Sequence, residues 1–260
     1  MEHLTYADYL HLDELLSLQR PRSDPEEHDE LLFIVTHQAY ELWFKLLLHE
    51  IDKARGDLFA GRLYPAISTL KRMRMVMKVM VEQIDILETM TPASFASFRD
   101  RLERASGFQS VQFRELEFAL GYKRPDVLRY QPPGSPAQEV LRRRLAEASV
   151  MDALYAFLGR EGVTIPPGLR QPSPEGTRPN EAVQEGILRL YRERPDLEIL
   201  FELMTDFDEG FQEWRYRHIK LVERTIGNKH GTGGSLGVEF LKRTLFQPLF
   251  PDLWAIRHRL

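Results

Sequence analysis

The chain has 260 residues, 43% of them hydrophobic and 28% charged, and its formal net charge is −4. These values are typical of a globular protein with a substantial core, and they give no electrostatic reason to expect nucleic acid or an anionic membrane as a partner. The absence of cysteine excludes disulfides, zinc ribbons, iron–sulfur clusters, a thiolate haem ligand and thioether-linked haem. The first residues lack the pattern of a signal peptide, and no apolar run reaches the ~20 residues of a membrane span, so we expect a cytoplasmic protein.

Helical patterns follow one another along the first half of the chain. Asp24, followed by proline and two glutamates, predicts the start of a helix that runs to about Arg55. A second helix is predicted from about Pro65, and two short ones follow, the first capped by Thr91 and the second ended by Gly121. The second helix carries apolar residues at heptad spacing, which indicates packing against another helix. These residues are Leu70, Met73, Met77, Met80, Ile84 and Leu87.

The second half continues in the same way. Residues 137–158 and 181–226 have helical patterns, the latter with a break near Pro195, and the tail predicts one or two short helices. Between them, residues 159–180 form a proline-rich, loop-rich excursion. No internal repeat and no run of alternating strand residues is found. The predicted fold is therefore all-α: one elongated helical bundle, a single domain spanning 1–260.

Two pairs of residues, each four apart, place an aromatic ring one helical turn from a polar group. The first pair is Phe33 and His37 in "LFIVTHQAYELWF"; no second histidine or carboxylate stands in an HExxH-like relation to His37, so on its own it is typical of a core or capping histidine. The second pair, Phe95 and Arg99 in "SFASFRDRL", suits a flat ligand with a carboxylate, because a guanidinium matches both carboxylate oxygens. The alternative for Arg99 is a surface ion pair with Asp100.

His218 belongs to a helical stripe of large apolar residues, so we expect its imidazole to point inward. A buried neutral imidazole needs a partner, which the residues alone leave open between a carbonyl, a carboxylate and a metal. A hydrogen-bonded core histidine is the simplest interpretation, and a metal or haem ligand is the functional one. The stripe consists of Phe207, Phe211, Trp214, His218, Leu221 and Val222.

The glycine-rich loop "GNKHGTGGSLG" follows this helix. Gly231 and Gly233 begin a GxGxxG pattern, but Leu236 occupies its third glycine position and the Lys-Ser/Thr ending of a P-loop is missing, so we do not expect a nucleotide. Such a loop can still surround a small ligand with backbone N–H groups and the Thr232 hydroxyl. The alternative is a flexible connector.

Taken together, these stretches resemble the haem-dependent tryptophan 2,3-dioxygenase family. The resemblance runs through "YADYLHLDELLSLQRP", "HDELLFIVTHQAYELWFKLLLHE", "FRDRLERASGFQSVQFRELEFALG" and "WRYRHIKLVERTIGNKHGTGGSLGVEFL", and it is weakest over residues 125–195. It implies an α-helical homotetramer, a dimer of dimers, with one haem b in each subunit. It also implies that the protein opens the indole ring of L-tryptophan with O2 to give N-formyl-L-kynurenine, the first step of tryptophan degradation by the kynurenine pathway.

The resemblance further implies roles for individual residues. His218 would be the axial ligand of the haem iron, and His37 the distal histidine, acting either as a base or only by orienting the indole N–H. Arg99 would bind the substrate carboxylate, and Thr232 the ammonium and carboxylate end. The other implied substrate-binding residues are Phe33, Ile34, Val35, Thr36, Phe95, Leu102, Ser106 and Gly107, together with Tyr6, Tyr9 and Leu10, which would reach a neighbouring subunit from the N-terminal segment 1–20.

Two other functions stay open at this stage. One is an indoleamine-type dioxygenase with a broader substrate range, which a weak preference for L-tryptophan over tryptamine and D-tryptophan would indicate. The other is a non-enzymatic helical protein that senses haem, or that binds no cofactor.

Overall fold

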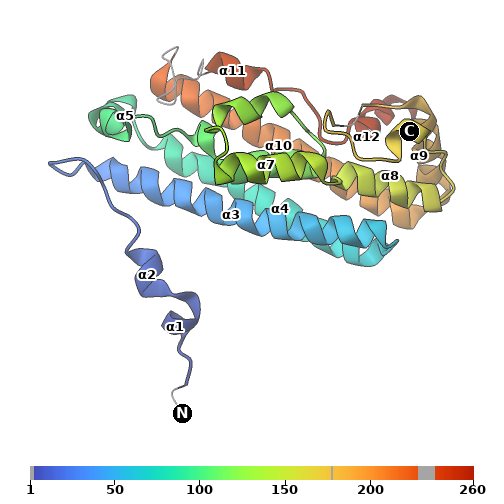
Figure 1. Ribbon diagram of the computed structural model, residues 1–260, viewed down its shortest axis with the longest axis horizontal. Helices are drawn as coiled ribbons and strands as arrows, with labels where there is room; N and C mark the ends of the chain where they lie inside the picture. The colour runs from blue at the N-terminus through green and yellow to red at the C-terminus, as the bar shows by residue number, and fades with distance from the viewer. Residues whose placement is uncertain (1–2, 177, 228–237) are drawn as a thin grey trace.

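The computed structural model describes residues 3–176, 178–227 and 238–260. Every regular element in these ranges is a helix, which confirms the all-α prediction. Three long helices, α3 (His28–Phe59), α4 (Leu63–Glu88) and α10 (Pro195–Ile226), run side by side and give the body its elongated shape (Figure 1). The shorter α-helices are α1 (Tyr6–Leu10), α2 (Leu12–Leu16), α5 (Pro92–Arg99), α6 (Val111–Leu120), α7 (Pro136–Ala146), α8 (Val150–Arg160), α9 (Glu181–Glu193), α11 (Val238–Lys242) and α12 (Pro251–Ala255). Single-turn and short 3-10 helices are η1 (Asp100–Leu102), η2 (Gly107–Gln109), η3 (Pro125–Tyr130), η4 (Pro167–Leu169) and η5 (Arg257–Arg259).

Helix α4 lies in the middle of the frame and contacts both α3 and α10 along its length. The heptad residues from Leu70 to Leu87 are all buried, as the sequence predicts. Burying each of these side chains contributes roughly 1.5–3 kcal/mol. At Gly210 of α10, a Cβ atom would lie 2.9 Å from Cγ of Met77, so the glycine allows the two helices to approach closely.

The prediction that the first long helix starts at Asp24 is wrong, because α3 begins at His28. The buried Glu30 carboxylate accepts hydrogen bonds from the backbone N–H groups of Arg22 at 2.8 Å and Ser23 at 2.9 Å. The Ser23 hydroxyl in turn accepts a hydrogen bond from the Glu27 N–H at 2.9 Å. These bonds hold the preceding segment across the first turn of α3, so the helix cannot extend backwards through it.

The single helix predicted over residues 137–158 is in fact two helices, α7 and α8. The ammonium group of Lys123 donates hydrogen bonds to the carbonyl oxygens of Leu145 at 2.9 Å and Glu147 at 2.6 Å, and so satisfies carbonyls that end α7. Ser149 then caps α8 in a reciprocal capping box. The residue that ends α7 is distant in sequence, so the helical pattern alone could not reveal the break.

Two buried carboxylates fasten the C-terminal segment to the bundle. Asp208 of α10 accepts hydrogen bonds from the Phe250 N–H at 3.0 Å and the Trp254 indole N–H at 2.9 Å. Asp252 of α12 accepts one from the Tyr155 hydroxyl at 2.6 Å. The chain therefore returns along α10 after α11, and the tail contains two short α-helices where the sequence predicts one or two.

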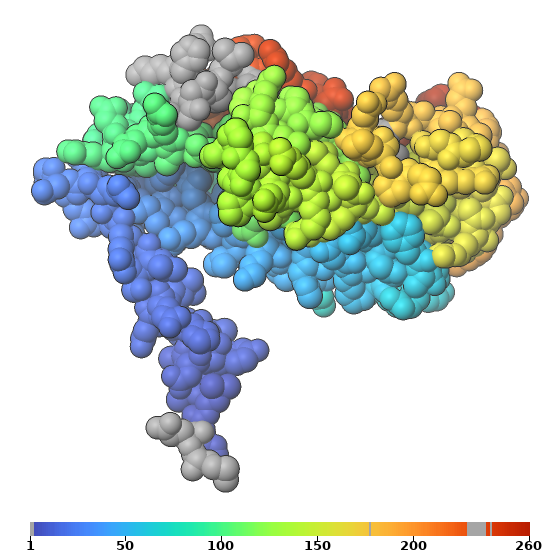
Figure 2. Space-filling model, in the orientation of Figure 1, coloured from blue at the N-terminus to red at the C-terminus, as the bar shows by residue number. Residues whose placement is uncertain are grey.

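The N-terminal segment leaves the body of the molecule. Figures 1 and 2 show α1 and α2 extending away from the helical frame, and neither helix has a buried residue. We call residues 3–20 the N-terminal arm. Its helices are only five residues long, which is too short for stability without packing.

Within the described ranges, α3 is the one helix whose length and composition would suffice to cross a membrane. It contacts α4, α6 and α8, and it buries the carboxylates of Glu30, Glu50 and Asp57 along its length. Only 22% of its apolar window is buried in the bundle, and Leu31, Val35 and Leu42 are among its exposed apolar residues.

Candidate functional site

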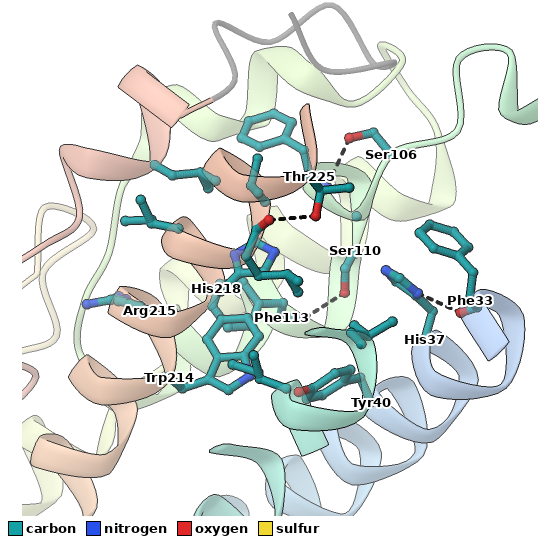
Figure 3. A pocket seen from close by; sticks show the side chains of 18 of the residues that line it. Phe33, His37, Tyr40, Ser106, Ser110, Phe113, Trp214, Arg215, His218 and Thr225 are labelled. Carbon is teal, nitrogen blue, oxygen red and sulfur yellow. Dashed lines mark hydrogen bonds between the residues drawn. The ribbon is translucent and has the colours of Figure 1, made fainter. Parts of the chain in front are cut away.

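A cavity lies among α3, α4, α5, α6 and α10 (Figure 3). Aromatic rings form part of its wall: the Phe113 ring lies 5.5 Å from the Phe44 ring and 5.0 Å from the Trp214 ring. Phe113 also stacks almost parallel on Phe211, at 5.7 Å and 2°. Such a wall suits a large, flat and mainly apolar ligand.

His37 enters the cavity from α3 (Figure 3). Its Nδ1 lies 2.7 Å from the carbonyl oxygen of Phe33, one helical turn earlier. A carbonyl only accepts, so Nδ1 carries the proton and donates it. Burial lowers the pKa of His37, although the Phe33 carbonyl and the charge of Glu41 act in the opposite direction. The imidazole is therefore neutral near pH 7, and its Nε2 is a hydrogen-bond acceptor.

His218 enters the same cavity from α10. Its ring lies parallel to the Trp214 ring, with 5.1 Å between centroids and 6° between planes. Burial, together with the nearby His37 and the charge of Arg114, lowers its pKa to about 4. His218 is therefore a second neutral imidazole, held by the aromatic stripe that the sequence predicts.

The segment from α5 to η2 supplies another side of the cavity. Thr91 caps α5 and Pro92 opens it, as predicted, and the helix ends at Arg99, which lines the cavity. The Phe95 ring lies 5.8 Å from the Phe33 ring, so the two predicted aromatic positions face each other across α3 and α5. Three more predicted residues line the same side, namely Leu102, Ser106 and Gly107.

Several predicted residues are not part of the cavity wall. Ile34, Val35 and Thr36 do not line it, because each residue turns a helix by about 100° and only positions 33 and 37 face inward. Val35 is 47% exposed, and Thr36 is buried on another side of α3. The residues Tyr6, Tyr9 and Leu10 lie on the N-terminal arm, and Thr232 lies outside the described residues.

The structure adds charged residues that the sequence reasoning missed. Glu117 is fully buried at the cavity wall and contacts three guanidinium groups, those of Arg114, Arg124 and Arg215. Burial alone would raise the pKa of Glu117, but the three arginines lower it to about 2. We call these four residues the Glu117 cluster. The sequence held a signal for buried charge in "VQFRELEFAL", because charged residues there interrupt a helix that is too apolar to lie on the surface.

The fold and the cavity define a class: helical proteins whose bundle holds an aromatic ligand pocket with two neutral histidines. Comparison with known proteins is consistent with this. A family model described as tryptophan 2,3-dioxygenase matches residues 1–173 and 175–260. The chain is 52% identical to the tryptophan 2,3-dioxygenase of Anaeromyxobacter sp. (strain K), over 98% of this chain and 95% of that protein. It is 50% identical to the enzyme of that name from Herpetosiphon aurantiacus, over 98% and 97%, and 45% identical to that of Saccharopolyspora erythraea, over 98% and 92%.

The chain therefore belongs to the tryptophan 2,3-dioxygenase family, and it is an oxidoreductase of the dioxygenase class. The agreement covers nearly the full length of both partners in each comparison.

Proposed function

We propose that the protein binds one haem b and inserts both atoms of O2 across the indole C2–C3 bond of L-tryptophan, giving N-formyl-L-kynurenine in the first step of the kynurenine pathway. The observation that carries this proposal is the pair of neutral imidazoles, His37 and His218, that enter one aromatic cavity from two helices. Family membership supports the reaction class.

The residues of the cavity fit haem. The described residues contain no group of three or more His, Asp or Glu side chains that could hold a metal ion alone. The neutral His218 imidazole has a lone pair and would hold the haem iron. The parallel Trp214 ring fixes the plane of this imidazole. The aromatic wall suits the porphyrin faces.

Haem, when bound, supplies the iron that activates O2. The residues of the chain bind and orient the substrate and keep water out. Phe33 and Phe95 would hold the flat indole ring, and His37 would accept a hydrogen bond from the indole N–H through Nε2. Because burial lowers its pKa, His37 is a weak base, which favours an orienting role over proton abstraction.

The amino-acid end of the substrate needs charged partners. Arg99 lies at the end of α5 beside the aromatic pair, where its planar guanidinium would bind the carboxylate through two parallel hydrogen bonds. From the family resemblance, we assign Thr232 to the ammonium and carboxylate end. Leu102, Ser106 and Gly107 would complete this side of the pocket.

We further propose that the protein is a cytoplasmic homotetramer, a dimer of dimers, in which the N-terminal arm contacts a neighbouring subunit's site. Tyr6 and Tyr9 are 74% and 70% exposed and Leu10 is 40% exposed, so the arm presents apolar side chains that the described residues of its own chain leave uncovered. Deleting residues 1–10 should weaken the apparent affinity for L-tryptophan while leaving the unfolding free energy nearly unchanged. An unaltered affinity in a truncated tetramer would contradict this assignment.

An oxygen electrode and a visible spectrum test the main proposal. The reduced, haem-loaded protein should consume O2 when L-tryptophan is added and form a product with the absorbance of N-formyl-L-kynurenine. A Soret band that shifts with L-tryptophan but no oxygen uptake would indicate a haem sensor instead. Equal turnover of tryptamine, D-tryptophan and L-tryptophan would indicate an indoleamine-type dioxygenase.

A further inference from the structure

The Glu117 cluster carries more positive charge than its carboxylate can balance. Glu117 lies 2.6 Å from Arg114, 2.8 Å from Arg124 and 2.8 Å from Arg215, measured between carboxylate oxygens and guanidinium nitrogens. The three arginine side chains are only 7%, 17% and 3% exposed. Among the described residues, three guanidinium groups thus form ion pairs with one carboxylate in a site largely shielded from water, where uncompensated charge is costly.

The arginines differ in how fully the protein satisfies them. Arg215 also donates hydrogen bonds to the carbonyl oxygens of Gln247 at 3.1 Å and Thr244 at 3.5 Å, and Arg124 lies near Asp126. Within the part of the chain that the structure describes, the guanidinium groups of Arg114 and Arg124 each have one hydrogen-bond partner, Glu117, and the Nε atoms of Arg124 and Arg215 are buried without a partner. Arg114 and Arg124 therefore both have donors to spare, and of these two only Arg114 lines the cavity.

The position of Arg114 directs these donors. It follows Phe113, which Figure 3 shows at the wall of the cavity, and Arg114 itself lines that cavity. Its guanidinium lies 5.2 Å from the ring centroid of Phe108 and 5.1 Å from that of Phe113. These cation–π contacts and the bond to Glu117 fix the group, so that little conformational entropy would be lost when it binds an anion.

We propose that Arg114 is an anion-binding residue of the cavity and holds a carboxylate of the molecule bound there. A guanidinium with free donors matches the two oxygens of a carboxylate, and the anion would balance the excess charge of the cluster. Under the proposed function, on which this inference rests, two sources of such a group enter the cavity. These are the acid side chains on the rim of haem b and the carboxylate of the amino acid.

The chain offers a matched control. Arg114 and Arg124 contact the same oxygen of Glu117, but only Arg114 lines the cavity. Arg114→Met and Arg124→Met therefore remove the same charge from the same carboxylate, and in each variant Glu117 keeps two arginine partners. Circular dichroism and urea unfolding would establish that both variants fold, and Arg114→Lys provides a variant that keeps the charge.

The experiment titrates haem-free full-length protein with haem and with haem dimethyl ester, in which both acid groups are blocked. The wild type should bind the free acid more tightly, and Arg114→Met should lose roughly 10- to 100-fold of that preference, as for a hydrogen bond to a charged group. Arg124→Met should keep it, and Arg114→Lys should retain part of it. A second arm titrates L-tryptophan and tryptamine into the haem-loaded proteins. If Arg114 instead holds the amino acid, Arg114→Met weakens L-tryptophan alone and leaves the preference between haem and its ester intact.

A loss of affinity for the carboxylate ligand in either titration supports a carboxylate site at Arg114. The ligand that is affected identifies the molecule that supplies the carboxylate. Equal effects of Arg114→Met and Arg124→Met in both arms would overturn the inference, because Arg114 would then serve only Glu117. So would a variant that binds all four ligands like the wild type. A wild-type chain that takes up no haem would instead contradict the proposed function, so the two failures are distinguishable.

Discussion

Replacing Glu117 by glutamine should make the stability of the protein less dependent on acid pH. In the native protein Glu117 is fully buried, which alone would raise its pKa, but Arg114, Arg124 and Arg215 lower the pKa to about 2. Its ordinary value is 4.5. A carboxyl group with a depressed native pKa stabilises the fold above its unfolded pKa, and this stabilisation is lost as the pH falls through the native pKa.

The size of the effect follows from the two pKa values. A depression from 4.5 to about 2, at about 1.4 kcal/mol per pH unit, corresponds to about 3 kcal/mol of stability at neutral pH. Between pH 7 and pH 3 the wild type should lose about 2 kcal/mol of this amount. Glu117→Gln should be less stable at pH 7 by roughly 3–5 kcal/mol, because it leaves buried guanidinium groups without an anion. Its pH dependence, however, should lack the loss that is due to Glu117.

Urea unfolding at a series of pH values from 7 to 3 measures this, with the unfolding free energy as the readout. The gap between wild type and Glu117→Gln should narrow only below about pH 4.5. Glu50→Gln is a suitable control, because Glu50 of α3 is a buried carboxylate, as Glu117 is, but it pairs with a single arginine. That variant keeps the Glu117 cluster, so its unfolding free energy should fall with pH as that of the wild type does. Parallel curves for wild type and Glu117→Gln would refute the reasoning.

Three further changes have clear expected outcomes. Gly186→Ala would place Cβ 2.2 Å from Cγ1 of Val163, so it should lower the unfolding free energy measured in urea by about 1–3 kcal/mol. Gly56→Ala, whose Cβ would have no neighbour within 4 Å, should leave the unfolding free energy unchanged or raise it. Equal effects of the two substitutions would contradict the packing argument. His218→Ala should yield a folded, helical protein with little haem, and a full haem complement with an unchanged ferrous spectrum would show that His218 is not the ligand. Arg99→Ala should weaken L-tryptophan binding by about 2–5 kcal/mol and tryptamine binding little, in titrations that follow the haem spectrum; equal losses for both ligands would place the carboxylate anchor elsewhere, and Arg99→Lys should rescue only in part.

Features set by neighbouring residues could be predicted from the sequence. The cap at Thr91, the break at Pro195 and the buried stripe of α4 depend on local propensity and helical spacing, and all three are confirmed. The helix boundaries that were wrong depend on distant or side-chain partners. Lys123 ends α7 by a hydrogen bond to a carbonyl oxygen 22 residues away in the chain, and the Glu30 carboxylate binds backbone N–H groups of the segment that precedes α3. Neither interaction has a pattern in the sequence.

The candidate site also combines features set within one helix, which could be predicted, with contacts between distant residues, which could not. The pairing of Phe33 with His37 follows from helical spacing, and the inward direction of His218 follows from its stripe. Charged residues within the apolar helix "VQFRELEFAL" were a signal for the Glu117 cluster, but its partners could not be predicted, because the Arg215–Glu117 contact joins residues 98 apart and charged residues on a helix usually face water. Spacing along one helix says nothing about which partner a second helix brings.

The cavity takes its two histidines from positions about 180 residues apart, with α10 completing the wall that α3 begins. During synthesis at about 5–20 residues per second, the ribosome would add His218 roughly 10–40 s after His37. For all of that interval the nascent chain has only half of the pocket, so it cannot capture a ligand that must touch both walls. Under the proposed function, haem could therefore be taken up only once α10 has been added to the wall that α3 begins.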